Sequence, residues 1–168
     1  MQEVNYMNVS EKIQKQLPQG AFLTVKDNEG NVNTMTIAWG NLGFMWNKPI
    51  FTVMVRYSRH TYKLIENAED FTVSFPCKNQ LKEELRFCGS KSGRNLDKFK
   101  ELNLKIQDGK NVKSPIIADC DTHLECKIIY KQALETSGMS EYVKNIYGEE
   151  NDCHVLYYGE IVSCLINK

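Results

Sequence analysis

The sequence has no apolar run near the ~20 residues that span a bilayer, since runs such as Val53-Met54-Val55 fall far short of that length. Its first residues lack a basic stretch followed by an apolar block, so we expect no signal peptide and a cytoplasmic protein. Net charge is also absent, because 21 Lys and Arg balance 21 Asp and Glu. Nothing therefore attracts the whole chain to nucleic acid or anionic membranes. We predict neither as a partner, and any anion site must be local.

No CxxC pair occurs, which excludes the usual zinc-ribbon and thioredoxin signatures. The six cysteines stand apart from one another: Cys77, Cys88, Cys120, Cys126, Cys153 and Cys164. His123 lies between two of them, but His123 and Cys126 would point to opposite faces of a shared strand. We therefore predict no metal site and six reduced thiols, several of them buried.

Repeats, low-complexity tracts and Pro/Gly-rich linkers are missing too, so nothing divides the chain. What is present is an ordinary globular composition, with 42% hydrophobic and 25% charged residues. A length of 168 residues suits one domain with a real core, here residues 1–168.

Local patterns indicate more strand than helix. Apolar and alternating segments predict strands at 22–26, 32–39, 50–56, 71–75, 124–130 and 154–166. Short helices are predicted at 10–16, 61–68, 81–87 and 96–102, a loop at 88–93, and 140–147 is ambiguous. A doubly wound sheet would need regular strand–helix alternation. We predict instead a mainly β fold, an antiparallel, Greek-key-like barrel, closed or partly closed, with a few peripheral helices.

The junction Arg56-Tyr57-Ser58-Arg59-His60-Thr61 is the most informative local feature. A buried strand ends at Arg56, and a helix begins near Ser58 to Thr61. Two arginines and two hydroxyls within six residues suit a phosphate group, since both residue types donate hydrogen bonds to its oxygens. The alternative is a solvated helix start that Ser58 caps.

A second feature is the segment 33–40. On a strand, one face carries Asn33, Met35, Ile37 and Trp39, and the other carries Thr34, Thr36 and Ala38. Hydroxyls, a small Ala38 and the following Gly40 leave room for a flat ligand to approach the backbone, and Trp39 could pack along a ring. An ordinary barrel strand is the alternative.

Five segments together resemble the flavin reductase family, and most of all its flavoredoxin-type members. They are Asn33…Thr36-Ile37-Ala38-Trp39, Arg56…Ser58-Arg59-His60-Thr61, Cys88-Gly89-Ser90-Lys91-Ser92-Gly93-Arg94-Asn95-Leu96-Asp97-Lys98-Phe99, Leu124-Glu125-Cys126 and His154…Gly159-Glu160-Ile161. Each is weak alone, but their shared order and spacing over about residues 18–166 are specific.

The resemblance implies an FMN-binding split β-barrel that works as a homodimer, with FMN near the subunit interface. It further implies an NAD(P)H:flavin oxidoreductase. Hydride would pass from NADH or NADPH to FMN, and electrons then to a flavin, a ferric compound or a redox protein. The absence of a GxGxxG motif is compatible with a nicotinamide that stacks on the flavin itself, and hence with ping-pong turnover.

The resemblance also assigns residues. Those expected to border the isoalloxazine and ribityl chain are Asn33, Thr36, Ile37, Ala38 and Trp39, and those expected at the phosphate end are Arg56, Ser58, Arg59 and Thr61. Lys98 is expected to reach the flavin, from its own or the partner subunit. His154 is expected beside the flavin or the nicotinamide, although a buried, hydrogen-bonded structural role is the alternative. Residues 131–152 carry little of the family pattern.

Apolar patterning independently suggests a dimer, since Ile50–Val55 is apolar on both faces and Val155–Tyr158 nearly so. Three other functions stay open at this point. They are an electron-transfer flavoprotein reduced by a protein or thiol partner, a non-catalytic FMN-binding or nucleotide-sensing module, and a thiol or metal sensor built on Cys88, Cys153 and His154.

Overall fold

The computed structural model describes residues 1–148 and 152–167. In this part of the chain one antiparallel sheet runs in the order β3-β2-β6-β9-β10-β5-β4, and β1 adds to β10. The strands are β1 (Gln2–Glu3), β2 (Ala21–Lys26), β3 (Val32–Ile37), β4 (Gly40–Met45), β5 (Lys48–Arg56), β6 (Asp70–Phe75), β9 (Thr122–Ala133) and β10 (His154–Ile166). A separate pair joins β7 (Ile106–Gln107) to β8 (Ile116–Ile117).

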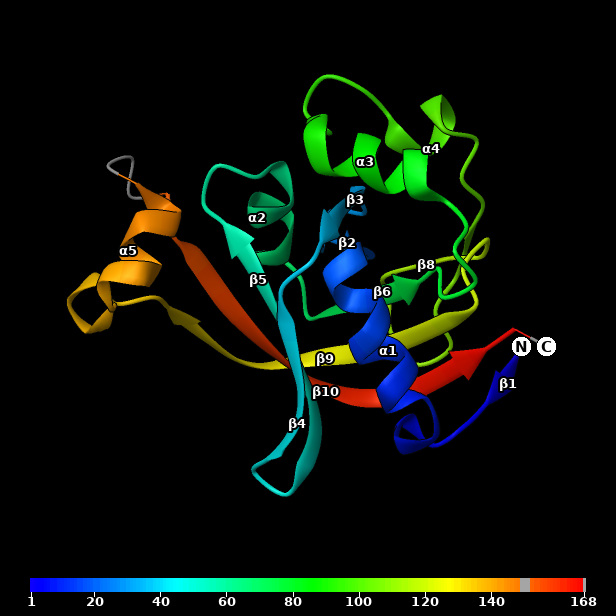
Figure 1. Ribbon diagram of the computed structural model, residues 1–168. Helices are drawn as coiled ribbons and strands as arrows, with labels where there is room; N and C mark the ends of the chain where they lie inside the picture. The colour runs from blue at the N-terminus through cyan, green and yellow to red at the C-terminus, as the bar shows by residue number, and fades with distance from the viewer. Residues whose placement is uncertain (149–151, 168) are drawn as a thin grey trace.

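The two edge strands of the sheet, β3 and β4, follow each other in the chain but do not pair. The sheet therefore curls into a barrel that stays split between them, as predicted for a mainly β split barrel. Ala38 and Trp39 lie between these strands and carry the chain across the split. The first strand, β1, lies beside the end of β10, because Gln2 pairs with Ile166 (Figure 1).

The central strand β10 fixes much of the geometry. It pairs with β9 on one side and β5 on the other, and its first residue, His154, lies opposite Arg56. Its register against β9 shifts between Tyr158 and Gly159. A Cβ at Gly159 would lie 2.5 Å from Cζ of Phe71 and 2.6 Å from Cβ of Cys126, so only glycine fits.

We expect Gly159→Ala to destabilise the barrel by about 1–3 kcal/mol, the usual cost of overpacking a core. Urea unfolding of the two proteins measures this difference. The matched control is Gly43→Ala in β4, where a Cβ meets nothing within 4 Å. The control should change stability by less than about 0.5 kcal/mol, and equal losses in the two variants would contradict the steric argument.

The core fills the barrel with side chains from most strands. Phe51, Val53, Phe71 and Tyr157 are among its fully buried members, and a second cluster centred on Phe22 and Leu85 lies beneath the helices outside. In β5, both Ile50 and Phe51 are buried within the single chain. This confirms that β5 is covered on both faces, but the cover comes from this chain.

The α-helices are α1 (Ser10–Gln16), α2 (His60–Ile65), α3 (Lys82–Ser90), α4 (Lys98–Glu101) and α5 (Glu141–Tyr147), and the 3-10 helices are η1 (Tyr6–Val9), η2 (Leu17–Gln19) and η3 (Thr136–Gly138). Helices α3 and α4 lie together at one end of the sheet, and α5 lies at the far end of β9 and β10 (Figure 1). None of the helices in the described ranges has the length and apolar character that a bilayer crossing requires.

Several predicted boundaries were wrong. The loop predicted at 88–93 begins as the last turn of α3, which extends to Ser90. Helix α4 starts later than predicted because the Asp97 carboxylate accepts from the N–H groups of Phe99 and Lys100 and caps it. The strand predicted at 32–39 ends at Ile37 as β3, and Gly40 and Gly43 belong to β4, which pairs with β5 over its length.

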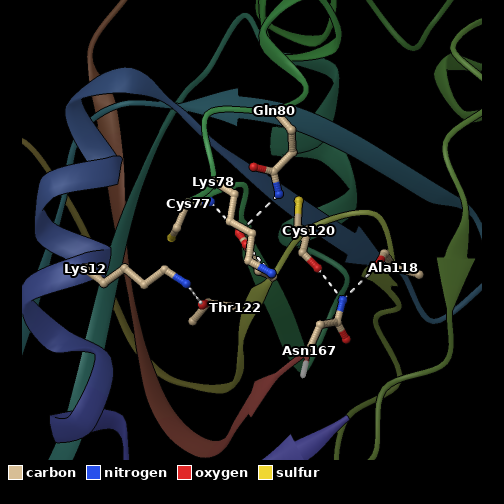
Figure 2. A network of polar contacts seen from close by, with 9 residues as sticks. Lys12, Cys77, Lys78, Gln80, Ala118, Cys120, Thr122 and Asn167 are labelled. Carbon is tan, nitrogen blue, oxygen red and sulfur yellow. Dashed lines mark hydrogen bonds and ion pairs between the residues drawn. The ribbon is translucent and has the colours of Figure 1, made fainter.

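Polar contacts join the loop after β6 to the residues before β9 (Figure 2). The buried Asp121 carboxylate accepts from the backbone N–H of Cys77 at 2.5 Å and from the Gln80 amide at 3.2 Å. From the end of β10, the Asn167 amide donates to the carbonyls of Ala118 and Cys120. These bonds fix the barrel end opposite His154.

Candidate functional site

Three segments meet beside the split in the barrel: the end of β3 with Ala38 and Trp39, the β5–α2 junction, and the start of β10. They form a cavity of about 290 Å³, here called the Trp39 pocket. Its lining includes Thr36, Ile37, Ala38, Trp39, Met54, Arg56, Arg59 and His154. Trp39 is 45% exposed, and its ring centroid lies 5.4 Å from that of His154. An indole and an imidazole thus offer a ring-shaped ligand two aromatic surfaces.

A second cavity of about 130 Å³ shares Met35 and Arg59 with the first and is called here the Thr61 pocket. Its polar lining includes Asn33, Ser58, Arg59, Thr61, Ser90, Lys91, Ser92, Arg94 and Lys98. No Asp or Glu of the described residues lines it. Several cations and hydroxyls without a carboxylate make this a site for an anion with several oxygens.

Hydrogen bonds hold the Thr61 pocket in shape. The Asn33 amide donates to Oγ1 of Thr61 at 2.8 Å. Nζ of the buried Lys98 donates to the carbonyls of Thr34 and Cys88, both at 2.9 Å. Burial lowers the pKa of Lys98, and the two carbonyls offset part of that cost by accepting from the ammonium. The prediction that Lys98 reaches the flavin stays a prediction, since Nζ is engaged by backbone oxygens here.

Both hydrogen-bond donors of Ser58, its N–H group and its hydroxyl, are bound to the carboxylate of Asp152. Its carboxylate accepts from the Ser58 N–H at 3.0 Å and from the Ser58 hydroxyl at 2.6 Å. Arg56 in turn donates to the backbone carbonyl of Asp152 at 3.2 Å. Helix α2 has Arg59 at its N-cap with no side-chain cap bond, so the alternative in which Ser58 caps the helix is wrong.

The four residues that we expected at the phosphate lie in two different pockets. Ser58, Arg59 and Thr61 line the Thr61 pocket, whereas Arg56 lines the Trp39 pocket with His154. The predicted ring-binding residues also divide. Thr36 turns its hydroxyl away to the carbonyl of Leu85 at 2.5 Å, and Asn33 belongs to the Thr61 pocket. Every predicted site residue therefore lines one of two adjoining pockets, but not always the expected one.

His154 is held by a residue that sequence patterns did not identify. Its Nδ1 lies 2.8 Å from the Tyr147 hydroxyl, and the Arg56 guanidinium carbon lies 5.1 Å from the Tyr147 ring centroid. The pKa of His154 is lowered to about 4. Burial is the main cause, and the positive charges of Arg56 and Arg59 outweigh the opposite effect of Asp152. The imidazole is therefore neutral at pH 7.

Tyr147, Asp152 and Arg94 were missed for different reasons. Tyr147 ends α5, in the segment whose pattern was ambiguous, although Ser140 caps this helix and Glu141 follows in its first turn. Those two residues were the available signal. Asp152 meets Ser58 across 94 positions, which no local pattern records. Arg94 stood within a quoted motif without an assigned role, and it donates to the carbonyl of Ser58 at 3.0 Å.

Cys88 lines the Thr61 pocket, and the other five cysteines line neither of the two pockets. All six are unpaired. Burial raises the pKa of Cys88 to about 11 and that of Cys164 to about 12, so both stay protonated and unreactive near neutral pH. Across residues 1–148 and 152–167, no three His, Cys, Asp or Glu side chains cluster as metal ligands would.

His123 gives a prediction about acid stability. The side chain is fully buried, and its Nδ1 forms a hydrogen bond with Oγ of Ser74 at 3.0 Å. Burial lowers the pKa of His123 from 6.5 to about 4. The unfolded chain therefore binds a proton more readily, so this contribution to stability is complete above pH 6.5 and falls as the pH drops toward 4.

At pH 5 the loss from His123 should reach about 2 kcal/mol. Urea unfolding at pH 7 and pH 5 measures it, with His123→Gln as the comparison. The wild type should lose more stability than the variant between these two pH values. Equal losses would show that His123 does not contribute to the acid effect.

Two adjoining pockets, one lined by cations and one beside an exposed indole, thus lie at the split of an antiparallel barrel. Comparison with known sequences places this fold in a family. Residues 15–168 match the flavin reductase like domain, and the chain belongs to that family.

Individual relatives are distant. A protein of Archaeoglobus fulgidus is 30% identical over 114 residues, which cover 68% of this chain but only 62% of that relative. Flavoredoxin of Desulfovibrio vulgaris (Miyazaki F) matches with a TM-score of 0.70 and 23% identity, over 89% of this chain and 69% of that one. An FMN-binding domain of a flavin reductases-like enzyme from Shewanella baltica has a TM-score of 0.68 and 20% identity, over 98% of this chain and 76% of that one. At these identities the likeness shows the fold.

Proposed function

We propose that this chain is an FMN-binding oxidoreductase that takes hydride from NADH or NADPH and delivers electrons to a flavin, a ferric compound or a redox protein. The observation that carries the proposal is that the two pockets adjoin, since Arg59 and Met35 line both of them. FMN has a terminal phosphate and a flat ring, and the Thr61 and Trp39 pockets suit these two ends in that order. Membership of the flavin reductase-like family supports the choice of a flavin.

The residues of this chain would bind and orient, while bound FMN would supply the hydride-accepting chemistry. Arg59, Thr61 and Arg94 would hold the phosphate. Trp39 and His154 would border the ring and leave the open side of the Trp39 pocket for the nicotinamide. His154 is neutral at pH 7 and therefore acts as a hydrogen-bonding group rather than as a charge. No nucleophile or carboxylate pair is needed for such a transfer.

The visible absorption spectrum of the protein after incubation with FMN and removal of free cofactor tests the first half of the proposal. We expect bands of bound oxidised flavin, and NADH or NADPH added under argon should bleach them. Failure to retain or titrate FMN at micromolar concentration would contradict flavin binding. Retained FMN that neither nucleotide bleaches would favour the electron-transfer protein or the non-catalytic module over the reductase.

The homodimer needs a different basis from the one that the sequence offered. The apolar faces of β5 are buried inside the single chain, so they do not require a partner. Exposed aromatic surface lies instead at the β4–β5 hairpin, where Phe44 is 66% and Trp46 53% exposed. The Trp46 ring contacts those of Tyr130 and Tyr158 with centroids 5.8 and 5.7 Å apart. We propose that a second copy covers this aromatic patch of Phe44, Trp46, Tyr130 and Tyr158.

Light scattering should give about twice the chain mass of 19.4 kDa at micromolar concentration. Trp46→Asn should shift the protein toward the monomer by at least about tenfold in dissociation constant, since a buried aromatic anchor is lost. Asparagine tolerates the positive φ of 52° at this position, so the hairpin should still form. Tyr142→Asn, at a side chain that is 76% exposed on α5, is the control. A monomeric wild type would reject the dimer, and an unaffected Trp46→Asn dimer would reject this patch.

A further inference from the structure

The last residue of α5 touches the first residue of β10. The Tyr147 hydroxyl and Nδ1 of His154 are 2.8 Å apart, and both side chains are 8% exposed. Their ring centroids lie 5.6 Å apart with an interplanar angle of 70°, so the phenol meets the edge of the imidazole. Among the described residues, no hydrogen bond uses the other ring nitrogen, Nε2. His154 lines the Trp39 pocket.

The direction of this hydrogen bond decides the chemistry of His154. A phenol has one proton to donate, and a bare imidazole nitrogen accepts it better than a phenolic oxygen accepts from an imidazole N–H. The described part of the chain offers the Tyr147 hydroxyl no other acceptor. Burial raises the pKa of Tyr147, so the phenol keeps its proton. The favoured arrangement is O–H···Nδ1, which leaves the imidazole proton on Nε2.

We propose that Tyr147 is a positioning residue that donates to Nδ1 of His154, fixes the neutral tautomer with its proton on Nε2, and so provides a hydrogen-bond donor to an acceptor atom in the Trp39 pocket. The identity of that acceptor rests on the proposed function. A carbonyl oxygen of the flavin ring and the carboxamide oxygen of the nicotinamide both have the required chemistry. A fixed donor discriminates between ligands that present an acceptor there and ligands that present a donor.

The charges around His154 favour the neutral ring. Arg56 on β5 and Arg59 before α2 disfavour an imidazolium, while Asp152 before β10 favours it. Burial is the largest cause of the shift, the arginines add to it, and the pKa falls to about 4. Arg56 also lies over the Tyr147 ring, which helps to hold the phenol in place. Between about pH 5.5 and pH 8 the ring is therefore neutral, and the Tyr147 hydroxyl selects which nitrogen carries the proton.

Long-range proton–nitrogen NMR spectra of the imidazoles test the tautomer in the flavin-free protein. The chain has three histidines, and a spectrum of His154→Gln assigns the resonances of His154 by difference. We expect a bare Nδ1 and a protonated Nε2 across this pH range. In Tyr147→Phe the ring should become a mixture of tautomers, while its pKa should stay low, because the burial and the arginines that lower it remain. Tyr142→Phe, on the exposed face of α5, should leave the spectrum unchanged.

A proton on Nδ1 in the wild type, or an unchanged His154 spectrum in Tyr147→Phe, would overturn the proposal. A merely structural role would lower stability without altering the tautomer. In the FMN-loaded protein, Tyr147→Phe should slow reduction by NADH about five- to tenfold, the value of one hydrogen bond, with FMN affinity changed less than about twofold. Failure of the wild type to bind flavin would contradict the proposed function, whereas the NMR result would still decide the role of Tyr147.

Discussion

Replacing Arg59 with glutamate should weaken FMN binding by about a hundredfold or more, because a charge-assisted hydrogen bond is lost and a repulsion is added. Arg59 lines both pockets, and its Nη1 is held by the carbonyl of Gly89 at 3.1 Å. Riboflavin lacks the phosphate, so its affinity should fall far less. Fluorescence titration of both flavins against the wild type and the variant gives the two ratios.

Lys63→Glu is the matched control, since it makes the same change of charge on α2 at an exposed side chain that does not line either pocket. It should lower FMN affinity by less than about threefold at physiological salt, because exposed charges are screened over about 8 Å. Arg56→Ala gives a second comparison. Arg56 lines the Trp39 pocket, so we expect similar losses for FMN and riboflavin there. Equal losses of affinity for the two flavins in Arg59→Glu would show that the phosphate does not bind in the Thr61 pocket.

The predictable strands are those whose residue types alone indicate a buried strand or a strand end. β5 and β6 are nearly continuous β-branched and aromatic runs, and β2 ends at the turn that begins at Asp27. β4 was missed because glycine has low β propensity, so its strand geometry comes from pairing with β5. Gly40 is needed there, since a Cβ would lie 2.6 Å from the carbonyl oxygen of Thr52.

The candidate site was predictable to the extent that its residues are close together in the sequence. Ser58, Arg59 and Thr61 belong to one junction, and their chemistry suggests an anion before any fold is known. Arg56 lies in the other pocket because it contacts Asp152 and Tyr147. These two residues are 96 and 91 positions away from it along the chain. Such contacts arise from the pairing of β10 with β5, which brings His154 opposite Arg56. Only the three-dimensional register reveals them.

His154→Ala should lower kcat/KM for the nicotinamide donor by about tenfold or more, the equivalent of about 1.4 kcal/mol of lost positioning. The effect on FMN affinity should be smaller, because Trp39 and the Thr61 pocket stay in place. Turnover should persist, since hydride transfer requires no acid and the ring is neutral at pH 7. For the same reason His154 should introduce no pH dependence between about pH 6 and pH 8.

Stopped-flow reduction of the FMN-loaded proteins by NADH and by NADPH measures this effect. The control is His123→Gln, which alters another buried neutral histidine at the opposite end of β10, where His123 pairs with Leu165. It should leave the reduction rate within about twofold, because a site that far from both pockets affects neither ring placement nor charge. If His154→Ala reduces as fast as the wild type with both donors, the histidine only supports the barrel rim. A tenfold loss confined to one donor would show that His154 also selects the nucleotide.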